Sequence, residues 1–228
     1  MIENHSAAMK LYSGPLSMFG AKVEIAAREK GLDFELHMVP FSQQQGYSPR
    51  NPEVLRINPK RQVPVWIDDE VELYDSTQIL EYLEHRWPSP ALWPASAAER
   101  ARARQQEHAS DEVFFPNVIR LMGLRASPDP VNAPEWIQAC AAIRAYYDQM
   151  ERVLEGSGFV AGSEYSYADK AFYMAQFFAA RHTVPITAAH GNLRSWRARV
   201  AARPAVKVVI DAMAAYLRSI DYPVPDYD

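Results

Sequence analysis

The chain has a single cysteine, Cys140, among its 228 residues. One thiol cannot form an intrachain disulfide, a CxxC redox pair or a cysteine-rich zinc site. The lack of disulfides favours a reducing compartment such as the cytoplasm. The histidines are scattered and show no HxxxH-type spacing, so the sequence predicts no metal site.

Long apolar runs and an excess of positive charge are also missing. No stretch approaches the roughly 18 consecutive apolar residues of a membrane helix. The first residues lack the basic and apolar regions of a signal peptide. A net charge of -4 leaves no basic surface for nucleic acid. With 48% hydrophobic and 23% charged residues, the composition predicts a globular cytoplasmic protein without a membrane or nucleic-acid partner.

Strand and helix patterns alternate through the first ninety residues. Short apolar or alternating runs between turn residues indicate strands, and longer runs that end at a glycine, such as Gly31, indicate helices. The expected strands cover residues 10–13, 33–38, 63–67 and 71–74, and the expected helices run from 17 to 30 and onward from 75. Residues 39–62 are expected to be irregular. The pattern therefore predicts a mixed four-stranded sheet with helices.

A proline-rich break at residues 87–94 separates this region from one that is helical throughout. Pro116 lies inside the first helical pattern and should kink it. The pattern predicts helices over residues 97–124, 134–154, 166–180, 193–202 and 204–219. The expected fold class is an α/β domain at residues 8–88 followed by an all-α helical bundle at residues 95–220.

Three segments together resemble the soluble, cytosolic-type glutathione S-transferase superfamily, in particular its bacterial, Ser-type members. Residues 11–31 are similar to the family's first strand, catalytic turn and first helix. Residues 57–65 and the pair Asp75-Ser76 are similar to its asparagine-proline run, its cis-proline and its acidic-serine pair. Residues 166–169 and 196–206 are similar to parts of its helical half. The resemblance implies a thioredoxin-like domain that binds glutathione, followed by an all-helical domain.

The chain departs from the family pattern at two positions. Arg61 stands in the asparagine-proline run where the family often has glycine, and Gly20 stands where related chains often carry a larger residue. These departures concern the shape of the site.

The resemblance implies that Ser17 is the catalytic residue, which donates a hydrogen bond to the glutathione sulfur. A thiol of pKa about 8.5 is mostly protonated at pH 7, and the thiolate is the nucleophile. Lowering this pKa by about 1.5 units requires roughly 2 kcal/mol. A hydroxyl donor supplies roughly 1.5–3 kcal/mol and a helix N-terminus about 0.3–1 kcal/mol. The alternatives are that Ser17 is only a helix cap, or that Ser13 is the donor.

Glutathione itself is expected to contact two further segments. A cis bond between Val63 and Pro64 would direct the Val63 backbone at the cysteinyl unit, as an added strand does. Gln62 or Lys60 would reach the glycine carboxylate, unless both are solvated loop residues. Ser76 would bind the γ-glutamyl carboxylate at a helix N-terminus, and Asp75 would face the ammonium group. The spacing of Asp75 and Gln78 also fits a plain capping box, and both roles can hold at once.

The pocket for the second substrate is expected to include Met18 and Phe19, which adjoin Ser17. Phe114 and Phe115 on the kinked helix are further candidates, although a place in the core is favoured for most of that apolar stretch.

These expectations predict a glutathione transferase that conjugates the thiolate to a small apolar electrophile. Glutathione would be the co-substrate, no metal would take part, and the resemblance implies a homodimer. The alternatives are a glutathione-dependent isomerase, dehalogenase or ether-cleaving lyase, and a non-catalytic interaction module of the same fold. A disulfide reductase is disfavoured because the first domain contains no cysteine.

Overall fold

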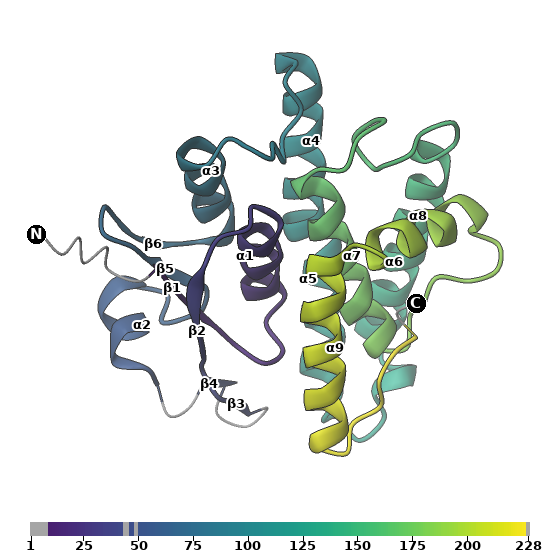
Figure 1. Ribbon diagram of the computed structural model, residues 1–228. Coiled ribbons are helices and arrows are strands. Elements are labelled where there is room, and N and C mark those ends of the chain that lie inside the picture. Colours follow the sequence, from purple (N-terminus) through teal and green to yellow (C-terminus); the bar gives the residue numbers. More distant parts are fainter. Residues whose placement is uncertain (1–8, 43–45, 48–49, 227–228) are drawn as a thin grey trace, which may run out of the picture. The chain divides into compact units, whose positions relative to one another are not determined.

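The computed structural model describes residues 9–42, 46–47 and 50–226 (Figure 1). The chain forms two compact units. The first comprises Met1–Ala91 with Asp211–Tyr216, and the second comprises Leu92–Ile210 with Leu217–Asp228. The predicted domain limits of 8–88 and 95–220 stay predictions, and residue 8 lies outside the described residues.

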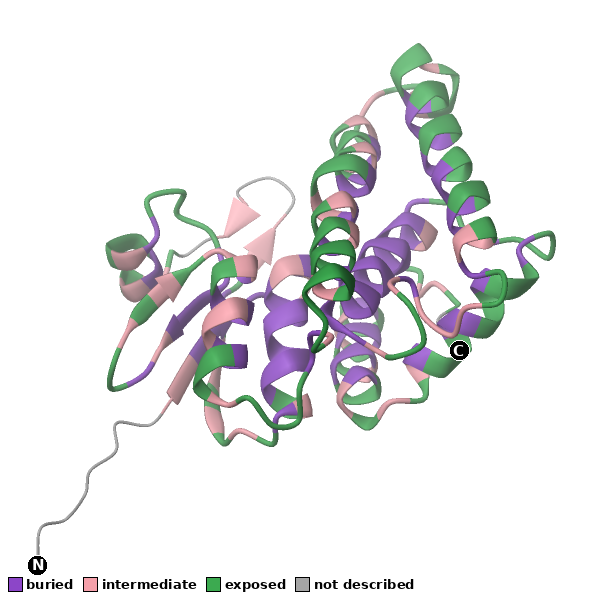
Figure 2. Ribbon diagram, turned by 90° about the horizontal axis from the view of Figure 1, so that it is seen from above, coloured by how far each residue is buried: buried purple, intermediate pink, exposed green. Residues whose placement is uncertain are grey.

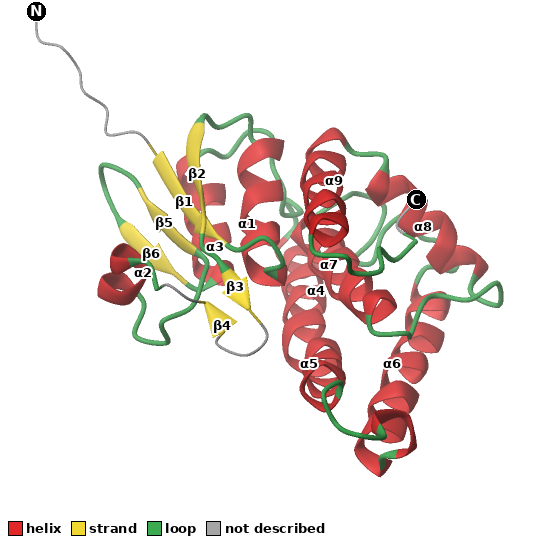
Figure 3. Ribbon diagram, turned by 90° about the horizontal axis from the view of Figure 1, so that it is seen from below, coloured by secondary structure: helices red, strands yellow, loops and turns green. Residues whose placement is uncertain are grey.

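A mixed four-stranded sheet forms the centre of the first unit, as predicted (Figure 3). Its strands run in the order β2-β1-β5-β6. β1 is parallel to β2 and antiparallel to β5, which is antiparallel to β6. The strands are β1 (Met9–Ser13), β2 (Phe34–Met38), β5 (Val65–Ile67) and β6 (Glu72–Tyr74).

Three helices accompany the sheet, and each begins at a polar cap. They are α1 (Met18–Glu29), α2 (Pro52–Ile57) and α3 (Ser76–Arg86). α1 ends before Gly31, which has a φ of +66°, a conformation that glycine adopts without steric cost. The buried Lys30 joins the end of α1 to the segment that follows α3. Its ammonium group lies 2.8 Å from a Glu84 carboxylate oxygen and donates to the carbonyls of Trp87 and Pro90.

The expected irregular stretch after β2 contains regular structure. β3 (Phe41–Ser42) pairs with β4 (Gly46–Tyr47), and α2 follows. A strand of two residues is too short to show alternation, so no periodic signal was available. α2 did carry a signal: Asn51 accepts hydrogen bonds from the N–H groups of Glu53 and Val54, and proline occupies the first helical position.

The described part of the second unit is helical. Its longer helices are α4 (Ala97–Ala109), α5 (Phe115–Leu124), α6 (Pro134–Val153), α7 (Tyr167–Arg181) and α8 (Gly191–Ala201). The last helix, α9 (Pro204–Ser219), is divided, because its residues Asp211–Tyr216 belong to the first unit. Past Ala95 the described residues form one isolated bridge, between Phe159 and Gly162, and no sheet, as predicted. No helix in the described part of the chain is long and apolar enough to cross a membrane.

A turn of π-helix interrupts the helix predicted over residues 97–124, just before Pro116 where a kink was expected. The π-turn Ser110–Phe114 joins α4 to α5, and the Phe115 N–H donates to the Ser110 carbonyl. Pro116 has no N–H to continue the i→i−4 ladder, so the chain changes its hydrogen-bond spacing one turn earlier.

Aromatic rings fill the core of the second unit, around the almost fully buried α7 (purple residues in Figure 2). Phe172 stacks on Trp196 with 5.1 Å between ring centroids and meets Phe114 edge-on at 5.5 Å. Asp169, which is fully buried, lies at the start of α7 in a capping box with Ser166. Burial raises the pKa of Asp169, and its hydrogen bonds oppose that effect.

The two carboxylate oxygens of Asp169 have separate partners. Oδ1 accepts from the Val160 N–H at 2.9 Å and from the Trp196 indole at 2.8 Å. Oδ2 accepts from the Ser166 N–H at 2.8 Å. Because donors face both oxygens, an amide group cannot replace the carboxylate without placing one N–H against another.

Asp169→Asn should therefore lower the free energy of unfolding by about 3 kcal/mol, since a buried donor loses its acceptor. Urea unfolding followed by tryptophan fluorescence measures this loss. Asp69→Asn, at an exposed position in a turn, is the matched control and should change stability by less than about 0.5 kcal/mol. Equal effects of the two substitutions would contradict this account of the network.

Candidate functional site

Ser17 lies in the turn between β1 and α1 and is the N-cap of α1. Its N–H donates to the Gly14 carbonyl at 3.1 Å, and its hydroxyl oxygen accepts from the Gly20 N–H at 3.0 Å. The predicted capping role is therefore present. A hydroxyl has two acceptor positions and one proton, so this bond leaves the Ser17 proton available for another acceptor.

Gly20 has a steric reason for lacking a side chain. A Cβ atom at this position would lie 2.0 Å from the Ser13 hydroxyl oxygen and 3.1 Å from that of Ser17. The missing side chain thus leaves room for two hydroxyl groups beside the first turn of α1. The Ser13 oxygen is buried and has no hydrogen-bond partner within the part of the chain that the structure describes.

Tyr47 of β4 covers the same turn. A Cβ atom at Gly14 would lie 2.6 Å from Cε1 of the Tyr47 ring and 3.1 Å from its hydroxyl oxygen. Burial raises the pKa of Tyr47, and a hydrogen bond with the Ser17 side chain lowers it. Sequence reasoning missed Tyr47, because nothing in its neighbourhood in the sequence relates it to Ser17.

The asparagine-proline run forms a tight loop. The Asn58 amide donates to the Gln62 carbonyl at 2.6 Å, and its oxygen accepts from the Lys60 N–H at 2.9 Å. Arg61 has a φ of +57°, in the left-handed region that glycine favours. This backbone conformation explains why the family often has glycine where this chain has Arg61. The Val63-Pro64 bond is cis, as predicted. The side chains of Gln62 and Lys60 are exposed.

Asp75 and Ser76 lie where β6 passes into α3. Asp75 is the cap of α3 and accepts from the N–H groups of Thr77 and Gln78 at 3.1 and 3.4 Å. It has a φ of +73°, and Ser76 is 4% exposed. The capping role is confirmed, and the role of this pair toward glutathione stays a prediction.

The sheet register brings the three predicted segments to one edge. Val65 of β5 lies between Tyr12 of β1 and Tyr74 of β6. The chain reaches this edge at the end of β1, at the beginning of β5 and again at the end of β6 (Figures 1 and 3). Because neighbouring strands are about 4.8 Å apart, the Ser17 turn, the cis-proline and the Asp75-Ser76 cap lie in a row.

The predicted pocket residues have different environments. Met18 is buried, and Phe19 is partly exposed, with the Lys22 ammonium 5.7 Å from its ring centroid. Phe114 and Phe115 lie in the aromatic core of the second unit. Phe114 packs against Tyr146 and Phe115 against Phe178, with centroids 5.2 and 5.9 Å apart. A part for these four residues in a substrate pocket stays a prediction.

The second unit also holds two arginines whose charges lie close together. Arg125 follows α5 and Arg181 ends α7, and their guanidinium groups lie 5.1 and 5.3 Å from the centroid of the Tyr222 ring. Arg181 is only 9% exposed, and this burial lowers the pKa of its guanidinium group. The nearby positive charge of Arg125 lowers that pKa further. Burial and the two arginines lower the pKa of His182 to about 3. Among the described residues, no ion pair includes Arg125 or Arg181. Sequence reasoning did not single out this pair.

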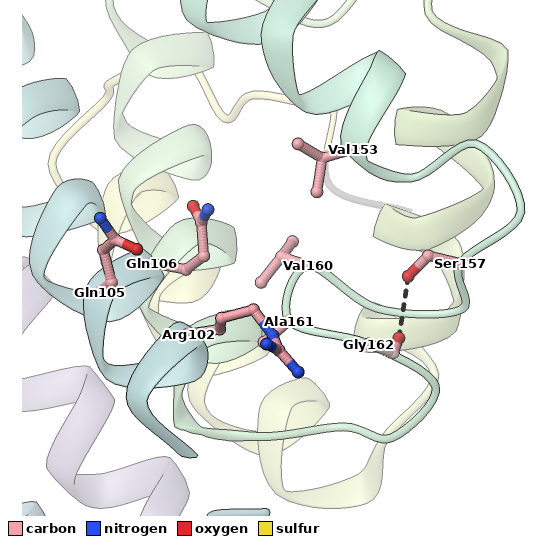
Figure 4. Close-up of a pocket in the computed structure, with 8 residues that line it drawn as sticks. All are labelled: Arg102, Gln105, Gln106, Val153, Ser157, Val160, Ala161 and Gly162. Atoms are coloured by element: carbon pink, nitrogen blue, oxygen red, sulfur yellow. Dashed lines mark hydrogen bonds between the residues drawn. The ribbon is translucent and has the colours of Figure 1, made fainter. Parts of the chain in front are cut away.

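A separate hollow of about 320 Å³ opens in the second unit between α4 and the loop after α6 (Figure 4). Its lining residues are Arg102, Gln105, Gln106, Val153, Ser157, Val160, Ala161 and Gly162. The Ser157 hydroxyl donates to the Gly162 carbonyl at 2.9 Å and closes the loop on one side. None of the predicted site residues lines this hollow.

Two family models match the chain. The model of the glutathione S-transferase N-terminal domain matches residues 11–91, and that of the C-terminal domain matches residues 115–204. The first match contains the predicted segments at residues 11–31, 57–65 and 75–76. The second contains residues 166–169 and most of residues 196–206.

Curated relatives carry related names. A zeta-class glutathione S-transferase of Euphorbia esula is 33% identical over 167 residues, which cover 71% of this chain and 71% of that protein. A maleylacetoacetate isomerase of Pseudomonas aeruginosa is 41% identical over 97 residues, which cover 42% of this chain and 45% of that protein.

The fold is also similar to solved structures. The crystal structure of poplar glutathione transferase F1 matches with a TM-score of 0.77 at 22% identity. The match covers 91% of this chain and 99% of that chain. At this identity the match supports the fold alone.

Gly20→Ala should lower the free energy of unfolding by about 1–3 kcal/mol, because the new methyl group collides with Ser13. Gly123→Ala is the matched control. Gly123 also lies within a helix, but nothing lies within 4 Å of a Cβ at that position. This control should gain about 0.5–1 kcal/mol from helix propensity. Chemical denaturation of both variants measures the two effects.

The double variant Ser13→Gly/Gly20→Ala separates the collision from other causes. Removing the Ser13 side chain takes away both of its atoms that approach the new methyl group. The double variant should therefore regain stability relative to Gly20→Ala. A further loss instead would show that Ser13 is not the obstacle.

Proposed function

Since this chain belongs to the glutathione S-transferase family, we propose that it conjugates glutathione to a small apolar electrophile, with Ser17 as the catalytic residue of a Ser-type enzyme. Members of this family use glutathione as a co-substrate. The observation that carries the proposal is the row formed by the Ser17 turn, the Val63-Pro64 bond and the Asp75-Ser76 cap at one edge of the sheet. A bound tripeptide would lie along this row.

Ser17 would stabilise the glutathione thiolate through its remaining proton. Its oxygen already accepts from Gly20, and donation to the sulfur would use its one proton. The sulfur would also lie near the N-terminus of α1, whose free N–H groups favour negative charge. Together these groups can supply the roughly 2 kcal/mol needed to lower the thiol pKa by about 1.5 units.

The rest of the tripeptide would be held by backbone and polar groups. The Val63 N–H and carbonyl, directed by the cis bond to Pro64, would pair with the cysteinyl unit as an added strand. Ser76 and the N-terminus of α3 would bind the γ-glutamyl carboxylate, with Asp75 facing the ammonium group. The exposed Gln62 would reach the glycine carboxylate.

The electrophile would lie against Met18 and Phe19, with Phe114 and Phe115 as further candidates for the pocket wall. Holding both substrates together removes much of the entropic barrier. We also propose a homodimer in the cytoplasm, as is typical of the family. A non-catalytic interaction module is disfavoured, because such a module has no need to keep Ser17, the cis-proline and the Asp75-Ser76 cap in one row.

A second candidate is a glutathione-dependent isomerase that acts on a carboxylate-bearing substrate. The relationship to the maleylacetoacetate isomerase of Pseudomonas aeruginosa supports it. The specific observation in its favour is the pair Arg125 and Arg181, since a buried positive charge is costly without a negative partner. A substrate carboxylate would supply that partner.

Ser17→Ala should abolish the proposed donation to sulfur. The loss of roughly 2 kcal/mol of thiolate stabilisation corresponds to about a thirtyfold fall in rate at neutral pH. The ultraviolet titration of bound glutathione should shift upward by about one to two pKa units, with little change in glutathione affinity. Ser13→Ala is the control and should leave the titration unchanged. A variant that loses only stability, by about 1 kcal/mol, would reduce Ser17 to a cap.

Arg181→Met should distinguish the two candidate activities. If Arg181 binds a substrate carboxylate, KM for maleylacetoacetate should rise about tenfold or more, as expected for a lost charge-assisted hydrogen bond. The KM for an uncharged aryl halide should stay within about twofold. Steady-state kinetics with both substrates provides the comparison. Equal changes in both KM values, or activity with the aryl halide alone, would rule out the isomerase assignment.

A further inference from the structure

We propose that Tyr222 is a positioning residue that holds Arg125 and Arg181 together as one binding site for a carboxylate group, because its ring attracts both guanidinium groups. This inference rests on the carboxylate site of the second candidate function and adds to it a residue from the C-terminal segment. Tyr222 would act through the two arginines, without binding the substrate itself.

The end of α9 fixes the place of Tyr222. The Tyr222 N–H donates to the Leu217 carbonyl at 2.9 Å, and the Asp221 N–H donates to the Arg218 carbonyl at 3.2 Å. Asp221 has a φ of +54°. Two such bonds around a left-handed residue form a Schellman motif, which ends a helix and turns the chain away from its axis. The motif therefore determines where the backbone of Tyr222 leaves the helix.

A second contact holds the segment beyond Tyr222. One guanidinium nitrogen of Arg197 in α8 lies 3.3 Å from a carboxylate oxygen of Asp226, and another donates to the Asp226 carbonyl at 3.4 Å. Arg197 is buried, and the Asp226 side chain is 80% exposed. The segment is thus held before Tyr222 by the end of α9 and after Tyr222 by α8.

Two guanidinium groups share the Tyr222 ring. Arg125 and Arg181 both lie over this ring, at 5.1 and 5.3 Å from its centroid. The face of an aromatic ring is negative and attracts a cation within about 6 Å. The ring therefore offsets part of the repulsion between two positive charges, one of which follows α5 while the other ends α7. Without the ring, this repulsion would drive the two side chains apart.

A guanidinium group over a ring can still bind an anion. Its flat face lies against the ring, whereas its N–H groups point outward in the plane and match the two oxygens of a carboxylate. Arg125 and Tyr222 are partly exposed, so a ligand can reach them from solvent. The ring and a carboxylate therefore do not compete for the same surface of the arginine.

The hydrogen bonds around Arg181 favour an acceptor as the ligand. Nη1 of Arg181 lies 3.2 Å from Nε2 of His182. Burial and the two arginines hold the pKa of His182 at about 3, so its ring is neutral at physiological pH. Because arginine only donates, Nε2 of His182 accepts and Nδ1 carries the proton. Nδ1 of His182 and Nε of Arg181 are buried donors without an acceptor in the part of the chain that the structure describes. Donors beside positive charge suit a carboxylate.

Calorimetric titration of the full-length protein with maleate, a small dicarboxylate, tests the role of the ring. Tyr222→Leu keeps an apolar side chain but removes the aromatic face. It should weaken maleate binding about fivefold or more, because the two cations lose their attraction to the ring. Tyr222→Phe keeps the ring and should bind maleate within about twofold of the wild-type protein. The KM of Tyr222→Leu should rise for maleylacetoacetate and stay within about twofold for an uncharged aryl halide.

Two further variants serve as controls. Tyr74→Leu removes a tyrosine of the first unit that is 38% exposed, and it should leave maleate binding unchanged. In an Arg181→Met background, Tyr222→Leu should cause a smaller further loss than in the wild-type protein, because one of the two cations is already absent. Circular dichroism and urea unfolding establish that each variant is folded.

Each remaining outcome counts against the proposal. Unchanged maleate binding in Tyr222→Leu overturns it. An equal loss in Tyr222→Phe also overturns it, because the hydroxyl and not the ring would then be required. A full loss from Tyr222→Leu in the Arg181→Met background would mean that Tyr222 acts elsewhere. If the wild-type protein does not bind maleate, or if Arg181→Met binds it equally well, the carboxylate site of the second candidate function fails. That result differs from the others, in which Arg181→Met weakens binding.

Discussion

The alignment of Tyr12, Val65 and Tyr74 across three neighbouring strands is the constraint on which the site depends. Because side chains alternate along a strand, a register shift of one residue would place every side chain of that strand on the opposite face of the sheet. It would also move the loop at the end of the strand away from the edge that the three segments share. Buried side chains hold the register, since Leu11, Val65 and Trp66 are fully buried. The packing of the core and the position of the site therefore have the same cause.

Close packing at the Ser17 turn follows from this constraint. One glycine on each side of Ser17 leaves room for another side chain. Gly14 leaves room for the ring of Tyr47, and Gly20 leaves room for the hydroxyl of Ser13. The cap and the proposed donor therefore lie within one helical turn. Under the proposed function a single hydroxyl serves both stability and chemistry, because the Ser17 oxygen caps α1 with a lone pair and retains its proton.

The sequence predicted the parts of the fold that carry a local signal. The four strands of the sheet alternate or are bounded by turn residues, and the helices have caps or stop residues at their ends. It missed β3 and β4, because pairs of two residues carry no period. Tyr47 and the pair Arg125 and Arg181 were missed for another reason. Each depends on residues far apart in the chain, so no spacing within the sequence relates them.

The environment of Lys30 has a consequence for chemical reactivity. Its ammonium group has three hydrogens, and these face the Glu84 carboxylate and the carbonyls of Trp87 and Pro90. The Lys30 side chain is fully buried. An acylating reagent therefore cannot reach its nitrogen while these contacts persist. Acylation of Lys30 would therefore report the opening of the first unit, and a mass-spectrometric map of acylated lysines would give the rate of that opening.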